Sequence, residues 1–393
     1  MRILMVHNDY GRYSGEEAVV DQFVADGRAG GYEMEVLRCT SKFARDSFWG
    51  QIRGFFSGIY SRSGVRMMRR AIRSFRPDVV HIHNLYPFIS PAALFECKRA
   101  DIPVIMTVHN YRLICPTGLF LRNGKPCEEC LIKGNENGCI RYNCEGNRFR
   151  SLGYALRNRV ARKRGSYLKN VDYYCCLTQF QKEKLAAAGF PEDRIFVFPN
   201  YMNMASRSVE AGLEGKNFVG YVGRLSEEKG FDLLVEVARR HPEIQFRFAG
   251  VKRENETIVQ LSNVEYCGQL GKEALTKFYE NARFVVIPSR CYEGFPLVIP
   301  EAYSKGVPCV VPNHGPFPEL IHNGNKYCGR TFVPSDVNDL EKQVISLWNA
   351  ESELIEYSHN AVDAYDKLYT KKVLNQRWHK FLHQVALHEK ITV

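Results

Sequence analysis

Short runs of β-branched and other apolar residues alternate with longer, mostly polar segments of helical spacing along the whole chain. Runs that are apolar throughout are typical of strands buried on both faces of a parallel sheet. In the first half, strands are expected at residues 3–7, 33–37, 78–83, 102–109, 172–177 and 195–200. In the second half they are expected at residues 217–222, 245–249, 264–270, 282–288 and 307–312. With helices between the strands, this alternation predicts an α/β protein with doubly wound parallel sheets.

A length of 393 residues is long for one domain and suits two of roughly 200 residues, each with its own core. Small and polar residues at 201–216 separate the two series of strands and indicate a linker. We therefore expect a Rossmann-like domain over residues 1–203 and a second over residues 204–370. Ligands of such sheets lie at the carboxyl ends of the strands, so the loops that follow the strands are the places to look for chemistry.

The loop after the expected strand at 282–288 carries two glutamates, Glu293 and Glu301. If a helix begins near Phe295, one carboxylate lies in the loop and the other about a turn and a half inside the helix. Both could then face one ligand. The amides of the loop and the positive end of the helix would point at an anion in front of the strand.

Two other strand-end loops carry candidate binding residues. Arg224 and Lys229 lie in a glycine-flanked loop before a helix at residues 231–240, where two cations could share one pyrophosphate. Gly15 closes a turn after the first strand, a frequent place for a phosphate or substrate. The alternatives are that the two cations cover a solvated turn and that Gly15 does no more than let the turn close.

Histidines end two strands of the first half. His109 follows the fourth expected strand, and His83 and Asn84 follow the third. In an open α/β sheet these positions face the ligand side. A lone histidine is nevertheless more often structural than catalytic.

Taken together, these motifs resemble those of family-4 retaining glycosyltransferases of the GT-B superfamily. The resemblance is carried by two glutamates that flank seven residues after a strand, by Gly-Arg…Glu-Lys-Gly at 223–230, and by His-Asn-Tyr followed by Cys-Pro and Gly at 109–118. It extends over nearly the whole chain and is strongest at residues 1–20, 78–145, 219–231 and 282–321. It implies two Rossmann-like domains facing a central cleft, and a C-terminal helix at 371–393 that crosses back to the first domain.

The resemblance also implies roles for individual residues. Glu293 would meet the transferred sugar and Glu301 the ribose of the donor, while Arg224 and Lys229 would bind the diphosphate. His109 would contact the donor sugar. The amides of Gly294, Phe295 and Leu297 would meet the sugar and its phosphate, Gly15 would belong to the donor site, and His83 and Asn84 would line the acceptor side. The family usually has glycine where this chain has Pro296, which has no N–H to donate.

By the same resemblance, the reaction moves a sugar from a nucleotide-diphosphate sugar to a glycan or lipid-linked acceptor with retention of configuration, as in surface-polysaccharide assembly. The chain contains no Asp-x-Asp motif of the kind that holds a metal on the diphosphate. We therefore expect fixed positive charges to stabilise the leaving group, with no cofactor required for catalysis. No nucleophile is assigned, because front-face attack lets the leaving phosphate accept the proton.

The net charge of +11 is concentrated in the first half, which holds 31 basic against 19 acidic residues through position 203. Seven arginines and no acid lie within residues 53–76, and eight basic residues and no acid within 148–169. Aromatic residues and methionines accompany the first run, a mixture that suits an anionic membrane surface. The alternative is a solvated helix that packs on the sheet. A nucleic-acid surface would carry similar charge, but no motif supports one, so no nucleic-acid partner is expected.

No apolar run approaches the roughly 18 to 20 residues of a spanning helix. The first residues are expected to form a strand rather than a signal peptide. These features predict a cytoplasmic protein that is peripheral at the inner face of the membrane.

Cysteines cluster in an insertion at residues 115–146. Cys127 and Cys130 form a Cys-x2-Cys pair suited to zinc, with Cys144 as a third ligand and Cys115 or Cys139 as a fourth. Unligated thiols that pin the insertion by packing are the alternative. Two other functions stay open: a nucleic-acid-binding module with a cysteine-rich zinc site, and an inverting GT-B enzyme or sugar-nucleotide epimerase.

Overall fold

The computed structural model describes residues 1–10, 15–41, 48–201, 204, 206, 215–253 and 257–391, apart from the side chains of residues 48, 49 and 51. Most of the turn expected before Gly15 and most of the expected linker at 201–216 lie outside these residues. The described part divides into two compact units. Unit 1 comprises Met1–Phe120, Glu128–Pro199 and Gln376–Val393, and unit 2 comprises Leu121–Cys127 and Asn200–Asn375.

Unit 1 is built on a six-stranded sheet with the order β2-β1-β3-β4-β7-β8, in which all neighbouring strands are parallel. Its strands are β1 (Arg2–Asp9), β2 (Glu33–Thr40), β3 (Val79–Ile82), β4 (Val104–Val108), β7 (Tyr173–Cys176) and β8 (Ile195–Val197). Its helices are α1 (Gly15–Ala29), α2 (Phe48–Ile59), α3 (Arg62–Phe75), α4 (Leu94–Arg99), α5 (Glu129–Ile132), α6 (Asn137–Arg141), α7 (Arg148–Lys163) and α8 (Gln179–Ala187), with the 3-10 turns η1 (Pro91–Ala93) and η2 (Glu192–Arg194).

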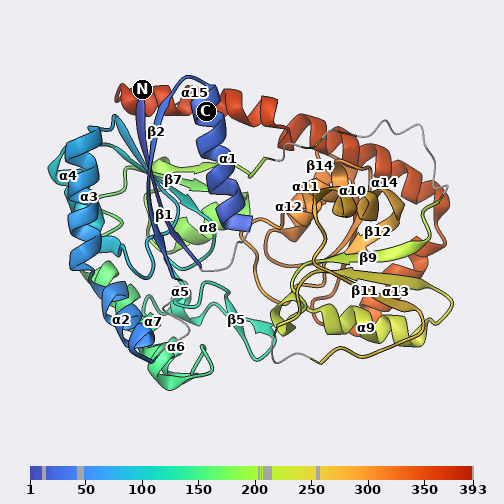
Figure 1. The fold of residues 1–393 in the computed structure, drawn as a ribbon. Coiled ribbons are helices and arrows are strands. Elements are labelled where there is room, and N and C mark those ends of the chain that lie inside the picture. Colours follow the sequence, from blue (N-terminus) through green and yellow to red (C-terminus); the bar gives the residue numbers. More distant parts are fainter. Residues whose placement is uncertain are drawn as a thin grey trace. The chain divides into compact units, whose positions relative to one another are not determined.

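Unit 2 repeats this plan with the order β11-β10-β9-β12-β13-β16, again parallel throughout (Figure 1). Its sheet strands are β9 (Phe218–Val222), β10 (Gln245–Ala249), β11 (Val264–Gly268), β12 (Ala282–Val286), β13 (Cys309–Pro312) and β16 (Gly329–Phe332). Two hairpins accompany the sheet, formed by β5 (Leu121–Arg122) with β6 (Lys125–Pro126) and by β14 (His322–Asn323) with β15 (Lys326–Tyr327). The helices are α9 (Phe231–Arg240), α10 (Lys272–Asn281), α11 (Val298–Tyr303), α12 (Phe317–Leu320), α13 (Val337–Trp348) and α14 (Glu351–Ala364), with the 3-10 turn η3 (Glu227–Lys229) and the π-helical turn η4 (Tyr365–Tyr369).

The C-terminal helix α15 (Lys371–Ala386) supplies part of the core of unit 1. Trp378 and Phe381 are buried in one hydrophobic cluster with Ile3 of β1 and Val79 of β3. Burial of such aromatic rings is among the largest apolar contributions a helix can make. The end of the chain is thus part of the fold of unit 1.

Both sheets meet the expectation of an α/β protein with doubly wound parallel sheets, because the buried apolar runs do form the strands. In β1, for example, every residue from Ile3 to Asn8 is buried. Within the residues described, no helix is both long enough and apolar enough to cross a membrane.

Candidate active site

Two loops at the carboxyl ends of β9 and β12 lie against each other in unit 2. Gly230 has a φ of 67°, and a Cβ added there would lie 1.9 Å from the carbonyl oxygen of Pro288. The backbone N–H of Arg290 donates to the carbonyl of Glu228 at 3.0 Å, and the Arg290 guanidinium binds the Asp232 carboxylate through two contacts of 2.6 Å. Glycine is required at position 230, because no side chain fits between the loops.

This contact brings Lys229 and Glu293 together, and the expectation that they serve one ligand stays a prediction. Lys229 Nζ lies 2.6 Å from Glu293 Oε2, and the two side chains are 24% and 11% exposed. Burial raises the pKa of Glu293, but Lys229, Ser289 and Arg224 together bring it below its usual value. Burial lowers the pKa of Lys229, and the Glu293 carboxylate more than reverses that effect. Both groups are therefore charged at neutral pH.

Arg224 lies beside this pair. Its guanidinium is 3.3 Å from the buried carboxylate of Glu228, which also meets Arg253 at 3.2 Å. The Arg224 side chain is 56% exposed, so its guanidinium keeps donors directed to solvent while one contact holds it. The sequence analysis did not single out Glu228, Arg253, Arg290 or Asp232, which hold the two loops in place.

Glu301 lies in α11, as expected, but this helix begins at Val298 rather than near Phe295. The reason is Pro300. A helix starting at Phe295 would place this proline in its interior, where the ring clashes and an N–H is missing, whereas a start at Val298 places it in the first turn. Because α11 has six residues, its dipole is small, and the amides of the preceding loop are the better anion ligands.

The Glu301 carboxylate accepts a hydrogen bond from the hydroxyl of Tyr279 in α10 at 2.7 Å. Burial nevertheless raises the pKa of Glu301 to about 7, since this bond compensates only in part. Glu301 therefore changes its charge near neutral pH, unlike Glu293.

In unit 1, three histidines lie at the ends of β3 and β4. His83 Nδ1 is 2.7 Å from His109 Nε2, and His81 Nε2 is 2.8 Å from the hydroxyl of Thr107. Burial lowers the pKa of His109 and of His81 to about 3 each, and it lowers that of His83 as well. The histidines are neutral at physiological pH, so His109 can exchange hydrogen bonds with a sugar but carries no positive charge.

The other predicted residues of unit 1 hold local structure. The Asn84 amide donates to the carbonyl of Asn8 at 2.6 Å and accepts from the N–H of Tyr86 at 3.0 Å, which ties the end of β3 to β1. Gly15 is the first residue of α1. Contacts of Asn84 with an acceptor, and of Gly15 with a donor, stay predictions.

A polar cluster beside these residues was missed by the sequence analysis. His7 and Asp9 of β1 lie near Glu16 and Glu17 at the start of α1. Burial lowers the pKa of His7 to about 4 and raises that of Glu16 to about 7. The available signal was the acidic pair that opens a helix directly after a strand carrying His and Asp at alternate positions.

The cysteine-rich insertion brings thiols near one another. The pKa of Cys139 is raised, most of all by a hydrogen bond with Cys144 and next by burial. The nearby thiols of Cys115 and Cys130 raise it further. Among the described residues, no three cysteines have sulfur atoms that all lie within 4.8 Å of one another. One ligand atom each of His7, Asp9 and Glu17 does meet this distance. Zinc binding by Cys127, Cys130, Cys144 and Cys115 or Cys139 stays a prediction.

Two family models match the chain in succession. Residues 13–205 match Glycosyltransferase Family 4, and residues 205–364 match Glycosyl transferases group 1. The chain is a family-4 glycosyltransferase of the GT-B superfamily. The match places β9, β12 and their loops, with Arg224, Lys229 and Glu293, in the group 1 part of this glycosyltransferase.

Individual relatives of the glycosyltransferase are distant. It is 25% identical over 289 residues to an uncharacterized 42.6 kDa protein in the cps region of Klebsiella pneumoniae, covering 72% of this chain and 69% of that protein. It is 26% identical over 300 residues to a glycogen synthase of Mycobacterium tuberculosis, covering 73% of this chain and 64% of that enzyme, less than two thirds of its length.

Solved structures share the fold. HepE of Anabaena in complex with UDP superposes with a TM-score of 0.67 at 16% identity, covering 98% of this chain and all of that one. Sucrose-phosphate synthase from Thermosynechococcus elongatus superposes with a TM-score of 0.73 at 15% identity, covering 99% of this chain and 100% of that one. These similarities establish the GT-B architecture of two parallel six-stranded sheets.

Proposed function

We propose that this glycosyltransferase transfers a sugar from a nucleotide-diphosphate sugar to a hydroxyl of a glycan or lipid-linked acceptor, with retention of configuration and without a metal ion on the diphosphate. The observation that carries the proposal is the Lys229–Glu293 pair with Arg224 beside it. Two cations and an ionised carboxylate converge there at the carboxyl ends of β9 and β12. A nucleotide sugar offers matching groups, because its diphosphate is anionic and its sugar hydroxyls are donors.

Departure of the nucleotide is the step that these cations assist. Cleavage of the bond between the anomeric carbon and oxygen leaves negative charge on the diphosphate. Arg224 and Lys229 would stabilise this charge, together with the amides of Gly294, Phe295 and Leu297. Charges already fixed in place cost no reorganisation when the bond breaks, and each such donor in an enclosed site contributes about 3 kcal/mol to the barrier reduction.

Glu293 would hold the sugar. Its carboxylate is ionised and tied to Lys229, so it can accept hydrogen bonds from two hydroxyls of the transferred sugar. Glu301 would accept bonds from the ribose. His109, held by His83, would be the second residue to contact the sugar, and as a neutral ring it can either donate or accept.

Surface-exposed aromatic residues among arginines support a peripheral membrane location. Phe56 of α2 is 63% exposed and Phe149 of α7 is 50% exposed, and the two helices meet where Phe55 stacks on Phe149 at a centroid distance of 4.6 Å. Rings at the interface and guanidinium groups on lipid phosphates are the usual means of binding an anionic bilayer. Co-sedimentation with vesicles of phosphatidylglycerol, but not of phosphatidylcholine, tests this point, and Phe56→Ser should weaken it.

A structural zinc ion in the cysteine-rich insertion belongs to the proposal as well. The free thiols of Cys139 and Cys144 are hydrogen-bonded to each other, and thiols become thiolates when they bind zinc. Metal analysis of the purified protein should find about one zinc per chain, and Cys130→Ser should remove it. Absence of zinc from wild-type protein purified without chelators contradicts this part of the proposal.

The transferase proposal is tested first by a thermal-shift screen against UDP-, GDP- and ADP-sugars. The donor found in this way then serves a transfer assay with Glu293→Ala and, as a matched control, with Glu236→Ala in α9, whose carboxylate pairs with Arg240 of the same helix. We expect Glu293→Ala to abolish transfer without loss of fold and Glu236→Ala to leave transfer unchanged. Near wild-type transfer by Glu293→Ala contradicts the site, and a product of inverted configuration contradicts the retaining mechanism.

A further inference from the structure

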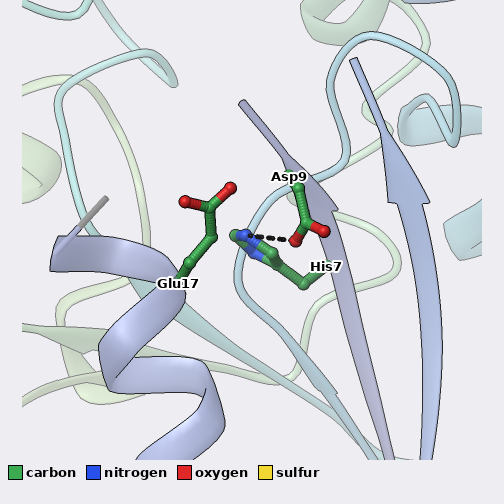
Figure 2. A group of neighbouring side chains, drawn as sticks. All are labelled: His7, Asp9 and Glu17. Carbon is green, nitrogen blue, oxygen red and sulfur yellow. Dashed lines mark ion pairs between the residues drawn. The ribbon is translucent and has the colours of Figure 1, made fainter. Parts of the chain in front are cut away.

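The polar cluster in unit 1 is formed by the last residues of β1 and the first turn of α1. His7 and Asp9 are two residues apart on the strand, so their side chains lie on the same face of the sheet. Glu17 reaches the same place from α1, where one of its oxygens accepts the N–H of Tyr10 at 2.9 Å. His7, Asp9 and Glu17 each offer one possible ligand atom, and these three atoms lie within 4.8 Å of one another. Figure 2 shows the imidazole between the two carboxylates.

Among the residues that the structure describes, the imidazole of His7 has no hydrogen-bond partner. The residue is 0% exposed, and neither Nδ1 nor Nε2 is satisfied. Asp9 Oδ1 lies 3.4 Å from Nε2 and 3.3 Å from Nε of Arg38, and within the described part of the chain this oxygen forms no hydrogen bond either. A buried imidazole whose two nitrogens lack hydrogen bonds destabilises the fold unless a further species binds it.

The charges around the cluster favour a cation as that species. Asp9, Asp21, Glu16 and Glu17 supply carboxylates, with partners in Arg38 and Arg112. Arg38 meets Asp9 at 3.3 Å and Asp21 at 2.6 Å, and Arg112 reaches Glu16 through the hydroxyl of Tyr10 by bonds of 3.0 and 2.9 Å. Among the described residues of the cluster, these four carboxylates outnumber the two guanidinium groups. An added anion would worsen this imbalance, whereas a divalent cation would correct it.

We propose that His7, Asp9 and Glu17 bind a divalent first-row transition-metal ion in unit 1, separate from the Arg224 and Lys229 site. A set of one imidazole nitrogen and two carboxylate oxygens suits manganese, iron, cobalt or zinc, whereas magnesium and calcium prefer oxygen alone. Three protein ligands leave coordination positions open for an oxygen of water or of a further ligand. If the proposed transferase activity holds, the further ligand is the acceptor, because the metal ion would lie at the strand ends of unit 1. An oxygen of the acceptor would then take one of the open positions.

Manganese is the probe of choice, because the cysteine insertion would compete for zinc but thiols bind manganese weakly. Free Mn²⁺ is counted by its electron paramagnetic resonance signal during titration of the full chain. We expect one site per wild-type chain and a loss of affinity of at least about tenfold in Asp9→Asn and in Glu17→Gln. The matched control is Asp21→Asn, which removes a nearby carboxylate outside the ligand group and should weaken binding by less than about threefold.

The metal site is tested by Mn²⁺ binding alone, and no measurement of sugar transfer is needed. Circular dichroism and the thermal shift of each variant with the nucleotide sugar confirm that the variants fold, since all three substitutions preserve side-chain shape. Wild-type protein that leaves the signal of free Mn²⁺ unchanged overturns the metal site. Equal affinity in wild type, Asp9→Asn and Glu17→Gln overturns it as well, because the ion then lies elsewhere. If transfer fails while manganese binds as expected, the proposed function is wrong and the metal site stands.

Discussion

Replacing Lys229 by methionine would leave the buried carboxylate of Glu293 without its nearest cation. The pair is joined at 2.6 Å, and its side chains are 24% and 11% exposed. Removal of one member of a buried ion pair costs about 3–5 kcal/mol, and because Lys229 is partly exposed we expect the lower end, about 3 kcal/mol. For a domain of the size of unit 2, where 1 kcal/mol shifts the melting temperature by about 2–4 °C, this loss corresponds to roughly 6–12 °C.

The loss should depend on pH with a definite sign. In wild type the pKa of Glu293 is lower in the folded than in the unfolded protein. The pair therefore stabilises the fold at pH values above the pKa of the carboxyl in the unfolded protein. This stabilisation is lost as the pH falls through the pKa of Glu293 in the folded protein. In Lys229→Met, burial without Lys229 raises the pKa of Glu293. The variant is then least stable relative to wild type near pH 8, and the gap narrows toward pH 5 as Glu293 takes up a proton.

Thermal unfolding of unit 2, followed by calorimetry at pH 8 and pH 5, provides the assay. The control Lys277→Met, at an exposed site on α10, should change stability by less than about 0.5 kcal/mol. The double variant Lys229→Met with Glu293→Gln should recover much of the loss, because no buried charge is then left. A loss in Lys229→Met below about 1 kcal/mol, or one that is the same at both pH values, would refute the reasoning.

Two further predictions concern the same loops. Gly230→Ala should destabilise unit 2 by more than Gly268→Ala does, because both residues have positive φ but only at Gly230 would a Cβ meet a backbone oxygen, at 1.9 Å. Strain at positive φ alone costs about 1–2 kcal/mol. Equal losses of stability in calorimetry would contradict the packing of the two loops. If Glu301 binds the ribose as proposed, donor affinity measured by titration calorimetry should rise several-fold between pH 6 and pH 8, because the pKa of Glu301 is about 7 and only the ionised carboxylate accepts bonds from both ribose hydroxyls. Glu301→Gln should lack this pH dependence, and an unchanged pH profile in that variant would remove Glu301 from the ribose site.

The sheet strands other than β16 were predicted, most clearly β3, β4 and β13, because a parallel strand that is buried throughout must be apolar throughout. β10 and α9 have the expected bounds. The strand β16 was not predicted, because Gly329–Phe332 is short and mixes arginine and threonine with one aromatic residue. Tertiary packing places this strand: Gly329 lies so close to β13 that a Cβ there would be 1.8 Å from the carbonyl oxygen of Cys309. The two short hairpins were missed for the same lack of a periodic pattern.

The residues of the candidate site were proposed from the sequence, but their geometry could not be. The family resemblance predicts that Arg224, Lys229 and Glu293 serve one ligand, and each of them follows a parallel strand. Spacing does not give the 2.6 Å contact of Lys229 with Glu293, which depends on the approach of two loops at Gly230. The start of α11 was predicted wrongly, although Pro300 was a readable signal. The cluster at His7 had only a weak sequence signal, the acidic pair Glu16 and Glu17 after His7 and Asp9, and it is the fold that brings these residues together.

The central claim is that two fixed cations hold the diphosphate of the donor. It is tested most directly by the dissociation constants of the preferred nucleoside diphosphate and of its nucleoside, measured in chelator for wild type and for Arg224→Gln. A charge-assisted hydrogen bond contributes about 1.5–3 kcal/mol, so the account predicts that the variant binds the diphosphate at least about tenfold more weakly and the nucleoside equally well. Unchanged diphosphate affinity in Arg224→Gln, or an equal loss for both ligands, would contradict it.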